Sequence, residues 1–240
     1  MHTGSDAPDD VARLFDGLFA VTPTESEDLL DAAAALRYEV YCVENAFEDP
    51  ADHPGGRERD IYDTHSRHAV LIHRPTARVV GCVRLILPYQ GDQVHPLPLV
   101  TQLGPDERRR LSSHDPRSIA EISRYAVSKQ FRRRSGEQLY PDVEALNLTA
   151  ADARRLFPHV SLGLLRAVGR LAAENRVTTL CAVMSPGLLR LLERFGLRFE
   201  LLGPVIDYHG LRQPCLANVA ELRASLAREH AAIARFVNET

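Results

Sequence analysis

Two carboxylates stand three residues apart in the segment Arg59-Asp60-Ile61-Tyr62-Asp63. At this spacing Asp60 and Asp63 can converge on one cation, either the ammonium group of a substrate or the guanidinium group of an arginine. A solvated acidic turn would have the same spacing. The residues alone therefore leave a cation site and a surface turn as alternatives.

An arginine lies inside an apolar run further along the chain. Arg84 is flanked by Cys82, Val83, Leu85 and Ile86. On a buried face its guanidinium group needs a carboxylate or phosphate partner, because burying an unpaired charge is costly. The alternative is an edge strand from which Arg84 points into solvent.

A glutamate in a third segment, Glu121-Ile122-Ser123-Arg124, could act as a base. Strand side chains alternate between faces, so Glu121 and Arg124 should point to opposite faces unless a bulge intervenes. A glutamate in a water-poor cleft has a raised pKa, in the range useful for a general base. A structural salt bridge is the other interpretation of Glu121.

A basic run from Lys129 to Gly136 follows this segment and contains Arg132, Arg133 and Arg134. Clustered guanidinium groups and free backbone donors suit a phosphate, either of a coenzyme or of a carrier-protein prosthetic group. A solvated charge run is the alternative. The run lacks the doubled glycine of a tight pyrophosphate loop.

Several other kinds of chemistry are not indicated. His65, His68 and His73 form no H-E-x-x-H motif, and the last two would lie on opposite faces of a strand, so no metal site is expected. Ser123 is not in a G-x-S-x-G motif, and there is no Walker or dinucleotide-binding glycine pattern. The scattered cysteines, without a C-x-x-C pair, are expected as small buried side chains: Cys42, Cys82, Cys181 and Cys215.

The composition is that of a globular protein, with 240 residues, 45% hydrophobic and 25% charged. Its 29 basic and 32 acidic residues give a net charge of −3, which does not favour nucleic acid or an anionic membrane as partner. Apolar runs fall well short of the ~20 residues of a membrane span. The start, MHTGSDAPDD, has no secretory signal pattern, so we expect a cytoplasmic protein.

The elements that must position these residues alternate between helix and strand. Gly81, inside a strand, indicates a bulge or a close backbone approach. The order predicts a mixed α/β sandwich in which one sheet is covered by helices. From hydrophobic periodicity and turn signals we expect a short helix at 11–19 and a turn at 22–24; a helix at 26–43; a loop at 48–59; strands at 68–73 and 78–87; an insertion outside the core at 88–116; a strand at 118–127; a helix at 161–175; a strand at 178–184; a helix at 186–195; paired strands at 198–202 and 205–209; and a last helix at 219–237.

Taken together, these segments resemble the acyl-homoserine-lactone synthase branch of the GNAT acyltransferase superfamily. Within that branch the chain is most similar to the N-acyl amino acid synthases associated with PEP-CTERM/exosortase systems. The branch resemblance is carried over about residues 31–135 by Leu36-Arg37-Tyr38-x-x-Tyr41, Phe47, Arg59-Asp60-x-Tyr62-Asp63, Gly81-x-x-Arg84-Leu85 and Glu121-x-Ser123-Arg124. The subgroup resemblance adds Arg154-x-Leu156-Phe157-Pro158-His159, Gly163-Leu164 and Asp207-Tyr208-His209-Gly210-x-Arg212-Gln213-Pro214-Cys215.

The resemblance implies a GNAT-like mixed central sheet flanked by helices, a three-layer α-β-α sandwich. The expected division is an N-terminal appendage at 1–24, the acyltransferase domain at 25–215 and a C-terminal helix at 216–240. Lactone synthases usually have Phe and Trp where this chain has Tyr41 and Phe47, on the side that takes the amine. This departure favours an amine other than S-adenosylmethionine.

The reaction implied is transfer of a fatty acyl group from a pantetheine thioester to the α-amino group of an amino acid. The missing glycine-rich coenzyme A loop favours acyl carrier protein over coenzyme A as the donor, and no tightly bound cofactor is expected. A lactone synthase that uses S-adenosylmethionine and an acyl-binding module without catalysis are the alternatives.

The roles implied follow from this reaction. Glu121 would take the amine proton, and Asp60 and Asp63 would hold the ammonium form. Three arginines, Arg37, Arg84 and Arg124, would brace the carboxylates or receive the amino acid carboxylate. Tyr41 and Phe47 would line the amine side. The donor side would consist of backbone groups at Tyr125, Ala126 and Val127, which stabilise the oxyanion, and of Arg132, Arg133 and Arg134, which meet the donor phosphate or an acidic carrier-protein helix.

Overall fold

The protein is described from a computed structural model, over residues 8–90, 93–131, 150–208 and 210–238. The chain divides into two compact units. Unit 1 comprises Met1–Glu58, Ala69–Cys82 and Tyr125–Ala167, and unit 2 comprises Arg59–His68, Val83–Arg124 and Val168–Thr240.

The strands form a mixed eight-stranded sheet in the order β1-β2-β3-β6-β7-β10-β8, with β9 paired to β10. Strands β6 and β7 are parallel, whereas β1 with β2 and β7 with β10 are antiparallel. A separate hairpin joins β4 and β5. The strands are β1 Phe19–Pro23, β2 Ser66–His73, β3 Arg78–Ile86, β4 Tyr89–Gln90, β5 Gln93–Val94, β6 Ile119–Val127, β7 Thr179–Met184, β8 Glu200–Leu201, β9 Ile206–Asp207 and β10 Leu211–Asn218.

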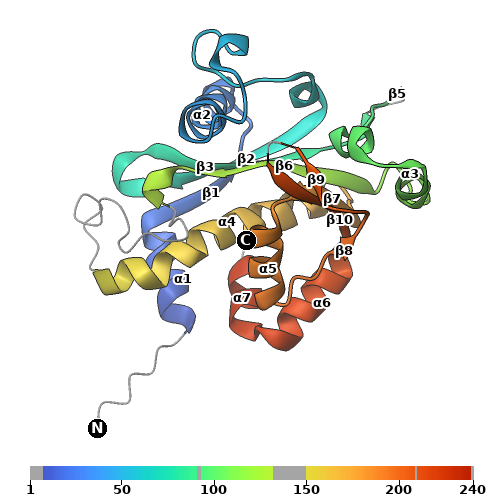
Figure 1. Cartoon of the computed structure of the whole chain (residues 1–240). Helices are drawn as coiled ribbons and strands as arrows, with labels where there is room; N and C mark the ends of the chain where they lie inside the picture. Colours follow the sequence, from blue (N-terminus) through green and yellow to red (C-terminus); the bar gives the residue numbers. More distant parts are fainter. Residues whose placement is uncertain (1–7, 91–92, 132–149, 209, 239–240) are drawn as a thin grey trace. The chain divides into compact units, whose positions relative to one another are not determined.

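In unit 1, helices cover both sides of the strands. Helix α2 (Glu27–Tyr38) lies on one side, and helix α1 (Pro8–Leu18) lies on the other (Figure 1). The predicted helix at 26–43 is confirmed as far as Tyr38, and the chain then continues as a π-helix, Glu39–Glu44. Together with the sheet, these layers confirm the predicted three-layer arrangement. The core beneath α2 consists of Ala33, Leu36, Val40, Val70, Cys82 and Ala126.

The N-terminal residues contribute to unit 1 more than the sequence predicted. The expected turn at 22–24 is wrong for its first two residues, because β1 pairs with β2 from Phe19↔His73 to Pro23↔Ala69. Phe15 of α1 is fully buried, and a Cβ at Gly163 would lie within 3.0 Å of its ring. Residues 8–23 are therefore part of the packed structure of unit 1. The domain boundaries themselves stay a prediction.

Gly81 in β3 lies at a close approach, as the sequence predicted. A Cβ there would meet Leu71 Cβ at 3.2 Å, the Ala126 carbonyl oxygen at 3.4 Å and Leu164 Cδ1 at 3.5 Å. Leu164 belongs to α4 (Ala150–Glu174), which starts at Ala150 and not at the predicted Ser161. Since alanine and leucine favour helix, the residues before Ser161 extend the same helix.

In unit 2, the segment 88–116 is part of the core, so its assignment as an insertion is wrong. It contains a 3-10 helix, Pro98–Gln102, and helix α3, Pro105–Leu111. Its four leucines bury their side chains although many of the surrounding residues are polar. They share one cluster with β3, β6, β7 and β10: Ile86, Leu97, Leu99, Leu103, Leu111, Ile119, Cys181, Leu202 and Leu216.

The C-terminal part of unit 2 differs from the prediction in three respects. Strand β10 was not predicted, because Pro214 and its polar neighbours are not typical of a strand. Strands β8 and β9 each pair with β10 and not with one another. The last helix is two helices, α6 (Val219–Glu229) and α7 (Ala231–Asn238), divided at His230 (φ −142°, ψ 66°). The predicted helix at 186–195 is confirmed as α5, Pro186–Arg194.

All four cysteines lie in described ranges, are buried, and form no disulfide. None of the helices in the described ranges combines the length and the apolar character that crossing a bilayer requires.

Candidate active site

Asp60 and Asp63 are held by the backbone at the start of a 3-10 helix, Ile61–His65. Asp60 is its N-cap residue, and its Oδ1 accepts a hydrogen bond from the Tyr62 N–H at 2.9 Å. In return, Asp63 Oδ2 accepts from the Asp60 N–H at 3.1 Å. This reciprocal capping fixes both carboxylates on the same short segment.

The cation between these carboxylates is Arg84 of β3. Its Nη1 lies 2.5 Å from Asp60 Oδ1 and 2.6 Å from Asp63 Oδ1, and its Nη2 lies 2.9 Å from Asp60 Oδ2. Its Nε donates to Ser123 Oγ at 2.8 Å. The Arg84 side chain is 1% exposed. Of the alternatives left open by the sequence, the buried arginine with carboxylate partners is therefore correct, and the outward-facing edge strand is wrong.

Arg124 joins the same charged cluster from β6. Its Nη2 lies 3.3 Å from Asp60 Oδ2. Its backbone is in the left-handed region, with φ at +49°, which interrupts the alternation of side chains along the strand. Both Ser123 and Arg124 can for this reason reach Arg84 and its carboxylates. We call Asp60, Asp63, Arg84 and Arg124 the charged cluster.

Glu121 lies beside the charged cluster in the interior of unit 2. It is 4% exposed, and its Oε2 accepts a hydrogen bond from the Leu99 N–H at 2.9 Å. Burial raises the pKa of Glu121 to about 7, against the opposing effects of the Leu99 N–H, Arg84 and Arg124. Asp60 adds to the rise. Three members of the cluster, Arg84, Arg124 and Asp60, therefore influence the pKa of Glu121.

Three further groups belong to this neighbourhood and were not assigned a role from the sequence. The Leu99 N–H comes from the segment that was expected to lie outside the core. Tyr62 has its pKa raised by burial, and then by Glu121 and Asp60. His68 Nε2 lies 3.7 Å from Asp63 Oδ1. In the sequence, Tyr62 and His68 lie close to the two aspartates, and this closeness could have indicated that they belong to the same site.

Arg37 has a carboxylate partner in unit 1. Its Nε binds Glu58 Oε2, and both side chains are almost fully buried. The Glu58 N–H donates to the Ala34 carbonyl oxygen at 3.1 Å. Glu58 is therefore joined to α2 by both its side chain and its backbone. Glu58 was not singled out in the sequence, because it lies in a stretch rich in turn residues. It stands two residues before Asp60 in the chain.

Tyr41 and Phe47 come together in unit 1 around the π-helix. Their ring centroids are 6.2 Å apart at an interplanar angle of 57°. The Phe47 N–H donates to the Tyr41 carbonyl oxygen at 2.7 Å, and Ala46 between them has a positive φ of 50°. A π-helix is a frequent feature of functional sites.

The predicted donor side lies along strand β6, which pairs with β7 in unit 2. Their parallel pairing runs from Ile119↔Thr179 to Ile122↔Ala182, whereas β7 continues to Met184. The Tyr125 hydroxyl donates to the Ser161 carbonyl oxygen, and burial raises its pKa. Ala126 and Val127 are buried. The side chains at 125–127 therefore serve packing.

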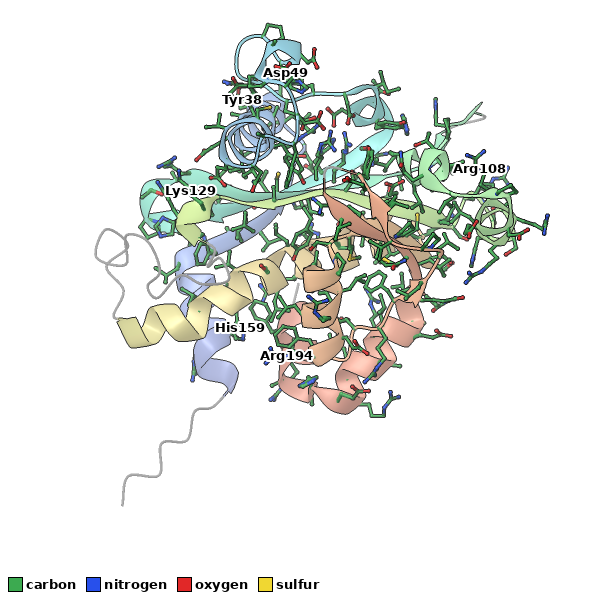
Figure 2. All side chains as sticks on the ribbon, viewed as in Figure 1. Tyr38, Asp49, Arg108, Lys129, His159 and Arg194 are labelled. Carbon is green, nitrogen blue, oxygen red and sulfur yellow. The ribbon has the colours of Figure 1, made fainter. Side chains whose placement is uncertain are left out.

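Only the first residues of the basic run, up to Phe131, are among the described residues. Arg132, Arg133 and Arg134 are outside the described residues. Lys129, which precedes them, is exposed near the end of β6 (Figure 2), and its N–H donates to Glu44 Oε1 at 3.1 Å.

Residues 36–141 match a family model described as the acetyltransferase (GNAT) domain. The comparison with curated proteins finds no match. Among solved structures, the chain is similar to the AHL synthase LasI, with a TM-score of 0.57 and 18% identity over 87% of this chain and 93% of LasI. It is similar to FeeM, an N-acyl amino acid synthase from uncultured soil microbes, with a TM-score of 0.57 and 14% identity over 88% of this chain and 96% of FeeM.

A third similar structure is that of BjaI, a CoA-dependent acyl-homoserine lactone synthase, with SAM and isopentyl-CoA. The TM-score is 0.61 and the identity 21%, over 90% of this chain and 89% of BjaI. At such identities the likeness establishes the fold. The chain therefore has a GNAT-like fold similar to that of these synthases, and its residues 36–141 match the acetyltransferase (GNAT) domain model.

Proposed function

We propose that the protein is an N-acyltransferase that moves a fatty acyl group from a pantetheine thioester to the α-amino group of an amino acid. The observation that carries the proposal is Glu121, a buried carboxyl group with a pKa of about 7 beside the charged cluster. The match of residues 36–141 to an acetyltransferase domain and the FeeM-like fold support the same reaction class.

Glu121 is suited to be the general base. An amino acid arrives with its amine protonated, and only the neutral amine can attack a thioester. A base with a pKa near the working pH is about half ionised and still binds a proton well, which is the optimum for proton transfer. In the proposed step the ammonium group loses one proton to Glu121, the neutral nitrogen bonds to the acyl carbon, and the carbon–sulfur bond breaks. A second proton of the nitrogen passes to the sulfur, so that a neutral thiol leaves.

The charged cluster suits a zwitterionic amino acid because it offers two carboxylates and two guanidinium groups. Asp60 and Asp63 keep 23% and 20% of their side chains exposed, so an ammonium group can approach them from solvent while Arg84 holds their inner side. Arg124 is 16% exposed, against 1% for Arg84 and 3% for Arg37. We therefore assign the substrate carboxylate to Arg124, and bracing roles to the other two.

The donor would lie along the end of β6. Backbone N–H groups beyond Ile122, at 124–127, would stabilise the oxyanion of the tetrahedral intermediate. Acyl carrier protein is the donor that we propose, with Arg132, Arg133 and Arg134 meeting its phosphate or an acidic helix. BjaI is described as CoA-dependent, so acyl-CoA belongs in the same test. Tyr41 and Phe47 would contact the amine, in an enzyme of the PEP-CTERM/exosortase-associated group.

The test is thiol release from long-chain acyl carrier protein and from acyl-CoA, each with a panel of amino acids, with the products identified by mass spectrometry. We expect an N-acyl amino acid that forms in step with free thiol. Glu121→Gln should lose the activity, whereas Glu174→Gln, on the surface of α4, should retain it. Methylthioadenosine release from S-adenosylmethionine would indicate a lactone synthase instead, and tight acyl retention without thiol release would indicate a binding module.

A further inference from the structure

The proposed reaction has to remove two protons from the same nitrogen atom. Glu121 takes the first one, before the amine attacks. The second has to leave after the attack, because a nitrogen that keeps both hydrogens stays positively charged, and the tetrahedral intermediate then returns to amine and thioester. Its destination is the sulfur atom, which is bonded to the same carbon. A direct transfer would close a small, strained ring, so a positioned group that bridges nitrogen and sulfur accelerates this step.

Ser123 offers a hydroxyl group at the charged cluster. Its Oγ accepts a hydrogen bond from Arg84 Nε at 2.8 Å. The other nitrogen atoms of the same guanidinium group hold the carboxylates of Asp60 and Asp63, at 2.5, 2.6 and 2.9 Å. The Ser123 hydroxyl and both carboxylates therefore lie around one planar group, and direct contacts within unit 2 join all of them.

The hydrogen-bonding capacity of this hydroxyl is only partly used. A serine oxygen has one hydrogen to donate and two lone pairs that can accept. Since Arg84 can only donate, its Nε uses one lone pair, and the hydroxyl hydrogen has to point away from Arg84. Among the residues that the structure describes, the Ser123 side chain makes no other hydrogen bond. Ser123 thus keeps one donor and one acceptor for a ligand.

This hydroxyl lies on the Glu121 side of β6. The two residues are separated by one position in the strand, so their side chains point to the same face. At the rise of a strand their Cα atoms are about 6.6 Å apart, a span that one tetrahedral centre can fill. Glu121 is buried, whereas Ser123, Asp60 and Asp63 are partly exposed. An amine that approaches the carboxylates from solvent would therefore meet the Ser123 hydroxyl beside them.

We propose that Ser123 is the proton shuttle of the acyl transfer, an inference that rests on the proposed function. In the tetrahedral intermediate, the nitrogen gives its second proton to Ser123 Oγ while the Ser123 hydroxyl gives its own hydrogen to the sulfur. The carbon–sulfur bond breaks, and an amide and a neutral thiol leave. The serine ends with one hydrogen, as it began, and no atom is oxidised or reduced. Arg84 stabilises the negative charge that develops on Oγ during the transfer.

The test compares Ser123→Ala with wild type on two donors that carry the same fatty acyl chain. One is the pantetheine thioester that the wild type uses, and the other is a thioester of thiophenol. Thiophenolate is a weaker base than an alkyl thiolate, so it leaves before the nitrogen loses its second proton and needs no shuttle. Ser123→Ala should lower kcat about a hundredfold with the pantetheine donor and less than about threefold with the thiophenol thioester.

A second readout needs only the pantetheine donor. Both carboxylates stay on Arg84 in Ser123→Ala, so KM for the amino acid should stay within about twofold of wild type while kcat falls. Ser123→Thr keeps a hydroxyl group and should retain at least about a tenth of the wild-type kcat. The matched control is Ser118→Ala, just before β6. The Ser118 hydroxyl donates to the Asp115 carbonyl oxygen at 3.1 Å, and its removal should change neither kcat nor KM.

Three results would overturn the shuttle. Equal slowing of Ser123→Ala with both donors, or a rise in KM at unchanged kcat, would mean that the serine only positions Arg84. A kcat within about twofold of wild type with the pantetheine donor would mean that the hydroxyl is not used. In each case the wild type still forms an N-acyl amino acid, and the proposed function stands. A wild-type protein that forms no such product would refute the proposed function and the shuttle with it.

Discussion

Replacing Glu121 with glutamine should make the protein more stable at pH 8 while it removes activity. Glutamine has nearly the same shape, and its carbonyl oxygen can accept the Leu99 N–H as the carboxylate does. What it cannot do is ionise. The stability difference between variant and wild type therefore measures what the buried charge costs the folded state.

The magnitude follows from the pKa of Glu121, which burial raises from an ordinary 4.5 to about 7. The folded state holds this proton more tightly than the unfolded state does. Between pH 4.5 and 7 the unfolded chain is ionised and the folded one is not, so wild-type stability falls as the pH rises through that window. Each pKa unit corresponds to about 1.4 kcal/mol, so the full loss above pH 7 is about 3 kcal/mol.

Urea unfolding at a series of pH values from 2 to 8 provides the assay. The free energy of unfolding of Glu121→Gln, relative to wild type, should rise by about 3 kcal/mol across this range. Glu229→Gln is a control of opposite sign, because hydrogen bonding to Arg198 lowers the pKa of Glu229 to about 2. That variant should lose stability relative to wild type as the pH rises from 2 to 4.5. A difference for Glu121→Gln that does not change with pH would refute a buried carboxyl group with a near-neutral pKa.

Two further substitutions test the packing around the site and in unit 1. Asp63→Asn leaves the buried Arg84 with a single carboxylate partner and should cost about 3 kcal/mol of stability, measured by denaturant unfolding; a loss below about 1 kcal/mol would mean that the pair is not buried in solution. Gly163→Ala puts a methyl group within 3.0 Å of the Phe15 ring and should lower stability by about 2 kcal/mol. At Gly187 an added Cβ would meet nothing within 4 Å, so Gly187→Ala should leave the free energy of unfolding unchanged or raise it in the same denaturant unfolding experiment.

The residues of the charged cluster were predictable because their chemistry is visible in the sequence. A D-x-x-D pair and an arginine in an apolar strand each require a partner, and the structure joins the two. The strands that carry Arg84 and Glu121 were also predictable, since β-branched and apolar runs mark β3 and most of β6. What remained open was which cation the aspartates hold, because that depends on pairing between segments far apart in the chain.

The backbone features of the site were not predictable. The left-handed conformation of Arg124 brings it to the cluster, yet nothing in its residue type indicates a positive φ. The Leu99 N–H reaches Glu121 from a segment whose prolines and charges are typical of a surface insertion. The leucines of this segment are buried because they pack against β6 and β7, a contact that the sequence of the segment does not indicate. Strand β10 was missed for a related reason, because burial and not residue preference makes it a strand.

The most direct test of the central claim is the pH dependence of a single turnover with saturating acyl donor and amino acid. For wild type, we predict that the rate of N-acyl product formation falls about tenfold per pH unit below pH 7 and is level above it, since only ionised Glu121 accepts the amine proton. Glu121→Gln should be slower by about a hundredfold or more at pH 8 and should lack this dependence. A Glu121→Gln protein with the wild-type rate and the same pH dependence would contradict the assignment of Glu121 as the base.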